Sequence, residues 1–154
     1  MLAAVVPAII AAACGKQLDV SKPERAIAAS IEERYSIDVQ GVSCPENLEA
    51  KKGSRFQCVV TLEGDRLTAN VTQIDSNGGL RYQLAEQILT ASSVAKAIRA
   101  QYNATSVDCG KRTYWVAHPN RTFTCRAKDD AGGAAKITVT VRDARGNIDL
   151  DIAD

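Results

Sequence analysis

The sequence has few aromatic side chains and no excess of charge of either sign. Aromatic residues make up 5% of the 154 residues, and 19 lysines and arginines against 18 aspartates and glutamates leave a formal net charge of +1. Nucleic-acid-binding domains are normally strongly basic, so this balance argues against a nucleic-acid partner. Disordered chains combine low hydrophobicity with high net charge, whereas 45% of these residues are hydrophobic. We therefore expect a folded protein that does not bind nucleic acid.

Groups that commonly carry catalysis or hold cofactors are also scarce. The single histidine, His118, stands before a proline, and Asp108 is the nearest acid that precedes it. A general base needs a nucleophile or an orienting carboxylate within reach. The sequence has no Gly-x-Ser-x-Gly motif, no phosphate-binding glycine loop and no cluster of histidines and carboxylates. The prediction is a protein that is not an enzyme and holds no metal or other cofactor; an enzyme would need His118 in a cleft with an acid or a nucleophile.

No apolar run is long enough for a transmembrane helix, because the longest, residues 1–13, falls short of the roughly 20 residues that a span requires. This run fits the apolar region of a signal peptide, and Ala11-Ala12-Ala13 directly before Cys14 resembles a bacterial lipobox, with alanine where leucine is usual. We expect Cys14 to carry lipid, including palmitate, and to anchor the mature protein to the outer side of the cell membrane. The alternative is a buried helix with a free cysteine, but residues 1–13 show no amphipathic periodicity.

The rest of the chain contains an internal repeat. Superimposing Ile27 on Val94 also superimposes Ile31 on Ile98 and Tyr35 on Tyr102. Small shifts in the alignment bring Cys44 onto Cys109 and Cys58 onto Cys125, with the order of features preserved. Such agreement favours a tandem duplication. We predict a leader and tether over residues 1–20, a first domain over 21–84 and a second over 85–154.

Each copy begins with a helical pattern and continues with strand patterns. The spacing of Ile27, Ile31 and Tyr35 gives one apolar helical stripe, and Ser21 with Glu24 has the spacing of a capping box. In the second copy Ser92 or Ser93 is the expected cap. Alternating residues then indicate strands separated by glycine-containing turns, which favours an antiparallel meander. The predicted fold class is α+β, with two small domains that each pack one helix on an antiparallel sheet of about four strands.

Four of the cysteines are predicted to form two disulfides. Cys44 with Cys58 and Cys109 with Cys125 are the expected pairs, because each pair lies within one copy of the repeat. Each bridge would tie the first strand of its domain to the second. By closing a loop in the unfolded chain, it would stabilise the folded state by about 3 kcal/mol in the chain-entropy model. A metal site is the competing use of four cysteines, but their spacing does not resemble that of zinc knuckles.

The segment between Cys109 and Cys125 is a candidate binding loop. It contains no aspartate or glutamate, and its cationic and aromatic residues are Lys111, Arg112, Tyr114, Trp115, His118 and Arg121. A closed loop of this kind would suit an anionic envelope polymer, a lipid headgroup or an acidic face of an envelope protein. Alternatively, Trp115 packs on its own domain and the cations are solvated. Joint exposure of Trp115 and His118 would favour binding, and burial would favour the alternative.

The cysteine motifs resemble a protein family. They are similar to those of a domain of unknown function, numbered 4333, known mainly from actinobacterial envelope lipoproteins. The matching motifs are Val42-Ser43-Cys44-Pro45 and Arg55-Phe56-Gln57-Cys58 in the first copy, and Val107-Asp108-Cys109 and Thr122-Phe123-Thr124-Cys125 in the second. The resemblance implies a cell-surface lipoprotein with non-catalytic modules, and it supplies no ligand. The leading hypothesis is a binding or scaffolding module. The alternative is a carrier or inhibitor that holds a small apolar ligand or lipid between helix and sheet.

Overall fold

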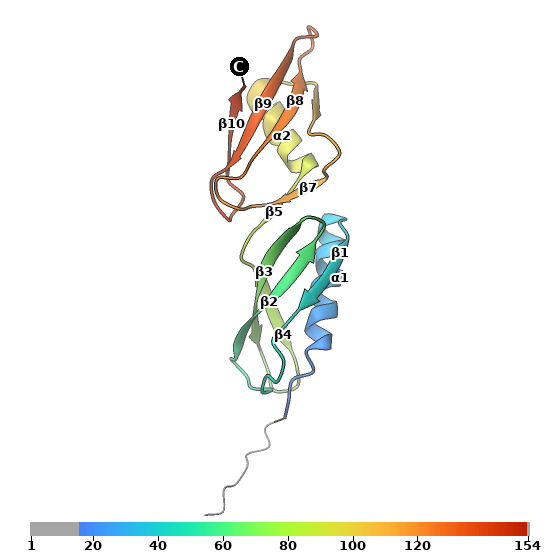
Figure 1. The fold of residues 1–154 in the computed structure, drawn as a ribbon, viewed down its shortest axis with the longest axis vertical. Helices are drawn as coiled ribbons and strands as arrows, with labels where there is room; N and C mark the ends of the chain where they lie inside the picture. Colours follow the sequence, from blue (N-terminus) through green and yellow to red (C-terminus); the bar gives the residue numbers. More distant parts are fainter. Residues whose placement is uncertain (1–15, 154) are drawn as a thin grey trace, which may run out of the picture.

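The computed structural model describes residues 16–153, which form two units stacked end to end (Figure 1). In the first unit a helix is followed by four antiparallel strands that pair in chain order. These elements are α1 (Ser21–Tyr35), β1 (Val39–Ser43), β2 (Arg55–Leu62), β3 (Asp65–Gln73) and β4 (Leu80–Leu84). Helix α1 buries Ile27 and Ile31 of its apolar stripe. The outer face of the sheet, which is opposite the core, carries mostly polar side chains such as Arg55, Gln57 and Asn70.

The second unit repeats this order. Helix α2 (Ala91–Tyr102) precedes a four-stranded sheet with the order β10-β9-β8-β6. The bounds of these strands are Ser106–Asp108 for β6, Thr122–Lys128 for β8, Ala134–Val141 for β9 and Ile148–Ile152 for β10. The predicted fold class, two small α+β units each with one helix and an antiparallel sheet, is confirmed. Cys14 and the rest of the predicted leader up to residue 15 lie outside the described residues.

The predicted start of α1 is wrong in its detail. The N-cap is Val20, which makes no side-chain cap hydrogen bond, and Ser21 is the first helical residue; its backbone N–H and hydroxyl both donate to Asp19 Oδ1. Glu24 reaches across to the sheet instead, where its carboxylate accepts a 2.9 Å hydrogen bond from the backbone N–H of Cys44. This contact links α1 to the residue that follows β1 and that forms the first disulfide.

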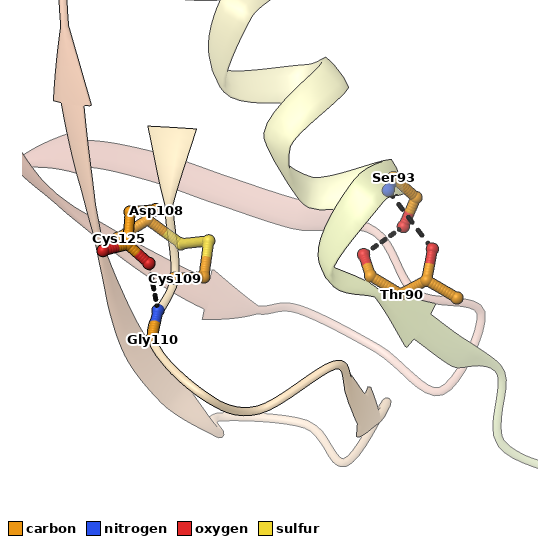
Figure 2. The surroundings of a disulfide bond; sticks show 6 residues. All are labelled: Thr90, Ser93, Asp108, Cys109, Gly110 and Cys125. Atoms are coloured by element: carbon orange, nitrogen blue, oxygen red, sulfur yellow. Dashed lines mark hydrogen bonds between the residues drawn. A yellow bond between two sulfur atoms is a disulfide. The ribbon is translucent and has the colours of Figure 1, made fainter. Parts of the chain in front are cut away.

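The cap of α2 also differs from the prediction of Ser92 or Ser93. Thr90 is the N-cap, and its hydroxyl accepts a 3.2 Å hydrogen bond from the backbone N–H of Ser93 (Figure 2). Ser93 returns the contact, since its hydroxyl donates to the Thr90 carbonyl. A threonine cap supplies an acceptor for one of the unpaired donors of the first turn, as a serine cap would.

Both predicted disulfides are present. Cys44 is bonded to Cys58 and Cys109 to Cys125. Each joins the residue after the first strand of its sheet to the middle of the second strand, and Figure 2 shows the second bond, with Asp108 accepting from the N–H of Gly110 beside it. Cys58 and Cys125 are buried. The bridges therefore lie at equivalent places and face the two cores.

A short ribbon between the two sheets was not predicted. Strands β5 (Ile88–Thr90) and β7 (Tyr114–Val116) pair antiparallel, with Ile88 opposite Val116 and Leu89 opposite Trp115. Successive residues of a strand point to opposite faces. Accordingly, Ile88, Tyr114 and Val116 belong to the core of the first unit, whereas Leu89 and Trp115 belong to that of the second. The ribbon is a layer shared by both cores, and it lies between the units in Figure 1.

Candidate functional site

The structure corrects the predicted binding loop. Tyr114 and Trp115 are buried, with 7% and 4% of their surface exposed, because they lie on β7 between the two cores. Trp115 stacks on Phe123, with ring centroids 3.9 Å apart and an angle of 6° between the planes. The burial of Trp115 favours the alternative, in which Trp115 packs on its own domain, over the candidate binding loop. Lys111 remains exposed.

Two further residues of the predicted loop bind a carboxylate of the first unit. Asp65 stands at the start of β3, and its side chain is only 4% exposed. Arg121 forms a two-pronged ion pair with it, in which Nη1 contacts Oδ2 and Nη2 contacts Oδ1. His118 Nε2 lies 3.1 Å from Asp65 Oδ1. We call Asp65, His118 and Arg121 the junction cluster.

The electrostatics of the junction cluster favour an ionised Asp65. Burial alone would raise the pKa of its carboxyl, but hydrogen bonds from Arg121 and His118 and the positive charge of Arg121 outweigh this effect and hold the pKa below its usual value. Arg121 also donates to the Val116 carbonyl at 3.3 Å. The guanidinium thus joins the β7 backbone to Asp65, and the cluster connects the two units electrostatically.

A second set of contacts reinforces the junction. The Glu63 carbonyl, in the turn between β2 and β3, accepts hydrogen bonds from the Tyr114 hydroxyl at 3.4 Å and from Arg112 Nη2 at 3.5 Å. Burial raises the pKa of the Tyr114 hydroxyl, which keeps it protonated as a donor. Four residues of the predicted loop, Arg112, Tyr114, His118 and Arg121, therefore contact the first unit. These side chains form hydrogen bonds and an ion pair that join the two units.

Removing the charge of Asp65 is expected to weaken this junction. Asp65→Asn keeps the shape of the side chain but loses its negative charge, and we expect a loss of about 2 kcal/mol in unfolding free energy at neutral pH, allowing for the partial exposure of Arg121. Because the folded pKa of Asp65 is lowered, its contribution is present above about pH 4 and is lost as the pH falls through the folded pKa. The difference between wild type and variant should shrink in acid.

Urea denaturation at neutral pH and at about pH 3 measures both effects. Asp151→Asn is the matched control, since Asp151 lies exposed on β10. The control is expected to leave stability within about 0.5 kcal/mol of wild type. A loss that is the same at both pH values, or equal in the two variants, would contradict the role assigned to Asp65.

The described residues offer little that resembles a catalytic or metal centre. His118 has one side-chain hydrogen bond within residues 16–153, and it is to Asp65, which is already paired with Arg121. Among these residues no group of three or more histidine, cysteine, aspartate or glutamate side chains is placed to hold a metal ion. No helix in the same part of the chain is long and apolar enough to cross a membrane.

A polar groove that sequence reasoning missed runs around β4. Two clefts of about 570 and 590 Å³ share the lining residues Asn70, Tyr82 and Gln83; one lies on the outer face of the first sheet and the other between β4 and the end of α1. The pair of clefts thus borders β4. We call it the β4 groove, and its characteristic side chains are Arg34, Arg55, Asn70, Arg81, Tyr82 and Gln83. No aspartate or glutamate lines either cleft.

A smaller, more apolar pocket lies between α1 and strands β3 and β4. Pro23, Ala26, Ile27, Val71 and Leu80 contribute most of its apolar lining, and its volume is about 240 Å³. Pockets for drug-sized ligands usually have volumes of about 300–1,000 Å³. This pocket is smaller than that range, and the carrier hypothesis, in which an apolar ligand lies between helix and sheet, stays a prediction.

Comparison with known proteins connects the first unit to a family. A family model described as a domain of unknown function (DUF4333) matches residues 2–78, half of the chain. The chain belongs to this family. The match covers α1, β1, β2 and β3 and ends before β4, so the matched segment of this chain includes Cys44 and Cys58. No curated protein and no solved structure matches the chain.

Proposed function

We propose that this DUF4333 protein is a lipid-anchored envelope protein whose two units form a rigid, non-catalytic binding or scaffolding module outside the cytoplasm. The observation that carries the proposal is a disulfide in each unit, Cys44–Cys58 and Cys109–Cys125. Disulfides persist in oxidising compartments and are rare in the cytosol. Small domains also depend on them, because a short chain buries too little surface to be stable by packing alone.

The position of the first described residues suits an anchor at Cys14. The Lys16 carbonyl accepts a 2.7 Å hydrogen bond from the Ala50 N–H, and the Leu18 N–H donates at 2.7 Å to the Leu48 carbonyl. The described chain begins, in blue, at the end of the first unit away from the second (Figure 1). Since two residues of chain reach at most about 7 Å, a lipid on Cys14 would hold this end against the membrane. The second unit would then point away from the membrane.

Rigidity supports the scaffolding part of the proposal. The β5–β7 ribbon contributes residues to both cores, and the junction cluster adds an ion pair between the units. A module of this kind keeps a binding face at a fixed distance from the membrane, which a flexible linker would not do.

We also propose that the second unit is a diverged copy of the family domain. Its support is the same order of helix and strands and a disulfide at the equivalent place. An actinobacterial cell envelope as the setting is part of the same proposal, and it follows from the resemblance of the cysteine motifs.

Replacing Cys14 tests the anchor. Cys14→Ala is expected to abolish incorporation of labelled palmitate and to move the protein from the membrane fraction to the soluble fraction, because acyl chains supply the membrane affinity at about 0.8 kcal/mol per buried methylene. Ala11→Leu is the matched control, since it brings residues 11–14 closer to the lipobox pattern and should preserve anchoring. Fractionation of cells and mass spectrometry of the mature protein make the measurement. An unmodified peptide that extends upstream of Cys14 in the mature protein would contradict the proposal.

A further inference from the structure

We propose that the β4 groove binds a polysaccharide strand that bears carboxylate groups. The proposal rests on the proposed function outside the cytoplasm, where such polymers are encountered. It assigns the binding face to the first unit, whereas the sequence had pointed to the loop of the second unit that the structure uses for the junction.

The first argument is a row of cations across the sheet. Arg55 on β2 stands opposite Thr72 on β3, and Thr72 stands opposite Arg81 on β4. Both arginines are exposed on the outer face, two strand spacings or about 10 Å apart. Arg34 lines the other cleft, beside α1, and not the cleft of Arg55 and Arg81; its guanidinium lies 5.4 Å from the centre of the Tyr35 ring. Arginine forks bind carboxylates with two parallel hydrogen bonds, so this row would hold successive acidic sugars.

The second argument is a parallel row of amides. Gln57, Asn70 and Gln83 stand opposite one another on β2, β3 and β4, one pleat along from the arginines. Gln57 Nε2 donates to Asn70 Oδ1 at 2.9 Å, which leaves the Gln57 side-chain oxygen and the Asn70 side-chain nitrogen to meet a ligand. Amides both donate and accept hydrogen bonds, as sugar hydroxyls do. Tyr82, between Arg81 and Gln83 on β4, points to the opposite face and packs against the core of the first unit, so it does not belong to the amide row.

The second unit provides an internal comparison. Its sheet pairs Thr122, Thr140 and Asp149 in one row and Thr124, Thr138 and Asp151 in the next. These rows stand where the first unit has its arginine and amide rows. Asp149 takes the place of Arg81 and Asp151 that of Gln83, and threonines take the places of Arg55, Gln57 and Asn70. The Tyr102 hydroxyl also donates to the Leu150 carbonyl at 2.7 Å, which occupies the space beside the last strand. At these two rows the second unit is therefore less suited to an anionic ligand than the first, although Arg126 and Lys136 stand opposite each other one row further along the same face.

The composition of the groove also favours a sugar polymer over a protein or a membrane. Protein interfaces have apolar centres with aromatic anchors, and membrane-binding surfaces insert apolar side chains. The large exposed apolar side chains described in the first unit are Val59 on β2, at 45% exposure, and Ile74 directly after β3, at 47%, and neither lines either cleft. Polar rows without an apolar centre suit a flat, hydroxyl-rich and anionic strand.

Binding of defined probes to the full chain carrying Cys14→Ala tests the inference. Titration calorimetry would compare an oligogalacturonate, an uncharged cello-oligosaccharide, a polyglutamate peptide and phosphatidylglycerol vesicles. We expect the oligogalacturonate to bind at least about tenfold more tightly than the uncharged sugar. Arg55→Ala/Arg81→Ala should weaken binding of the oligogalacturonate about hundredfold, and Arg55→Lys/Arg81→Lys by less, because lysine keeps the charge but loses the fork.

Arg99→Ala/Arg126→Ala is the matched control, since it removes two exposed cations from the second unit and changes the net charge equally. This control should leave the affinity unchanged. The inference is overturned if no oligosaccharide binds, if the groove variant binds like wild type, or if the peptide or the vesicles bind with the same dependence on Arg55 and Arg81. A Cys14→Ala protein that stays in the membrane fraction would bear on the proposed function alone, because these titrations need no lipid.

Discussion

Cys44→Ala/Cys58→Ala is expected to lower the unfolding free energy of the first unit by about 3 kcal/mol, since the bond closes a loop with a sequence separation of 14 residues. Alanine is preferred to serine because Cys58 is fully buried and a serine would place a hydroxyl in an apolar core. Small domains have total stabilities of roughly 5–15 kcal/mol, so this loss is a large fraction. Urea denaturation followed by circular dichroism measures it.

The second bridge supplies the matched comparison. Cys109→Ala/Cys125→Ala removes a bond with a separation of 16 residues, and because the entropy of loop closure grows only with the logarithm of length, the two losses should be nearly equal. Each double variant should destabilise its own unit first. A loss of unfolding free energy below about 1 kcal/mol in either variant would contradict the expectation that the bridge stabilises the fold by restricting the unfolded chain.

The sequence was most informative for strands that have one solvent-exposed face and one buried face. β2 alternates buried and exposed residues through Phe56, Gln57, Cys58 and Val59, so its period of two could be recognised. β7 has three consecutive buried residues because a different core lies on each side of it. A buried strand of three residues has no alternation to detect, and the shared ribbon therefore escaped prediction.

The candidate site was harder to predict because it depends on partners far apart in the chain. Arg121 was recognised as a cation in a loop without acids, but its partner Asp65 belongs to the other unit. The β4 groove depends on the register that aligns Arg55 with Thr72 and Arg81. One signal was available beforehand: Arg81 and Gln83 in the first copy correspond to Asp149 and Asp151 in the second, a reversal of charge within the repeat.

Trp115→Ala is expected to destabilise the protein by about 3–5 kcal/mol, the range for removing a large buried aromatic side chain. Trp115 contributes to the core of the second unit and stacks on Phe123, while its neighbours Tyr114 and Val116 pack in the core of the first. The cavity left by alanine would thus lie beside the shared ribbon. The ribbon cannot move into the cavity easily, because its other side packs in the core of the first unit. We expect thermal and urea unfolding of the second unit to shift most, with loss of ribbon protection in hydrogen exchange.

Trp115→Phe is the control that separates packing from recognition. Phenylalanine preserves a ring to stack on Phe123 and should retain more than half of the stability that alanine loses. The wild-type protein offers a direct readout, because Trp115 is the only tryptophan and is 4% exposed, so its fluorescence should be blue-shifted and should move to the red on unfolding. A Trp115→Ala protein with unchanged stability and weakened binding to an anionic ligand would restore the loop as a recognition surface. A Trp115→Ala protein that loses stability but still binds ligand at the β4 groove would show that Trp115 stabilises the second unit and that the first unit binds the ligand.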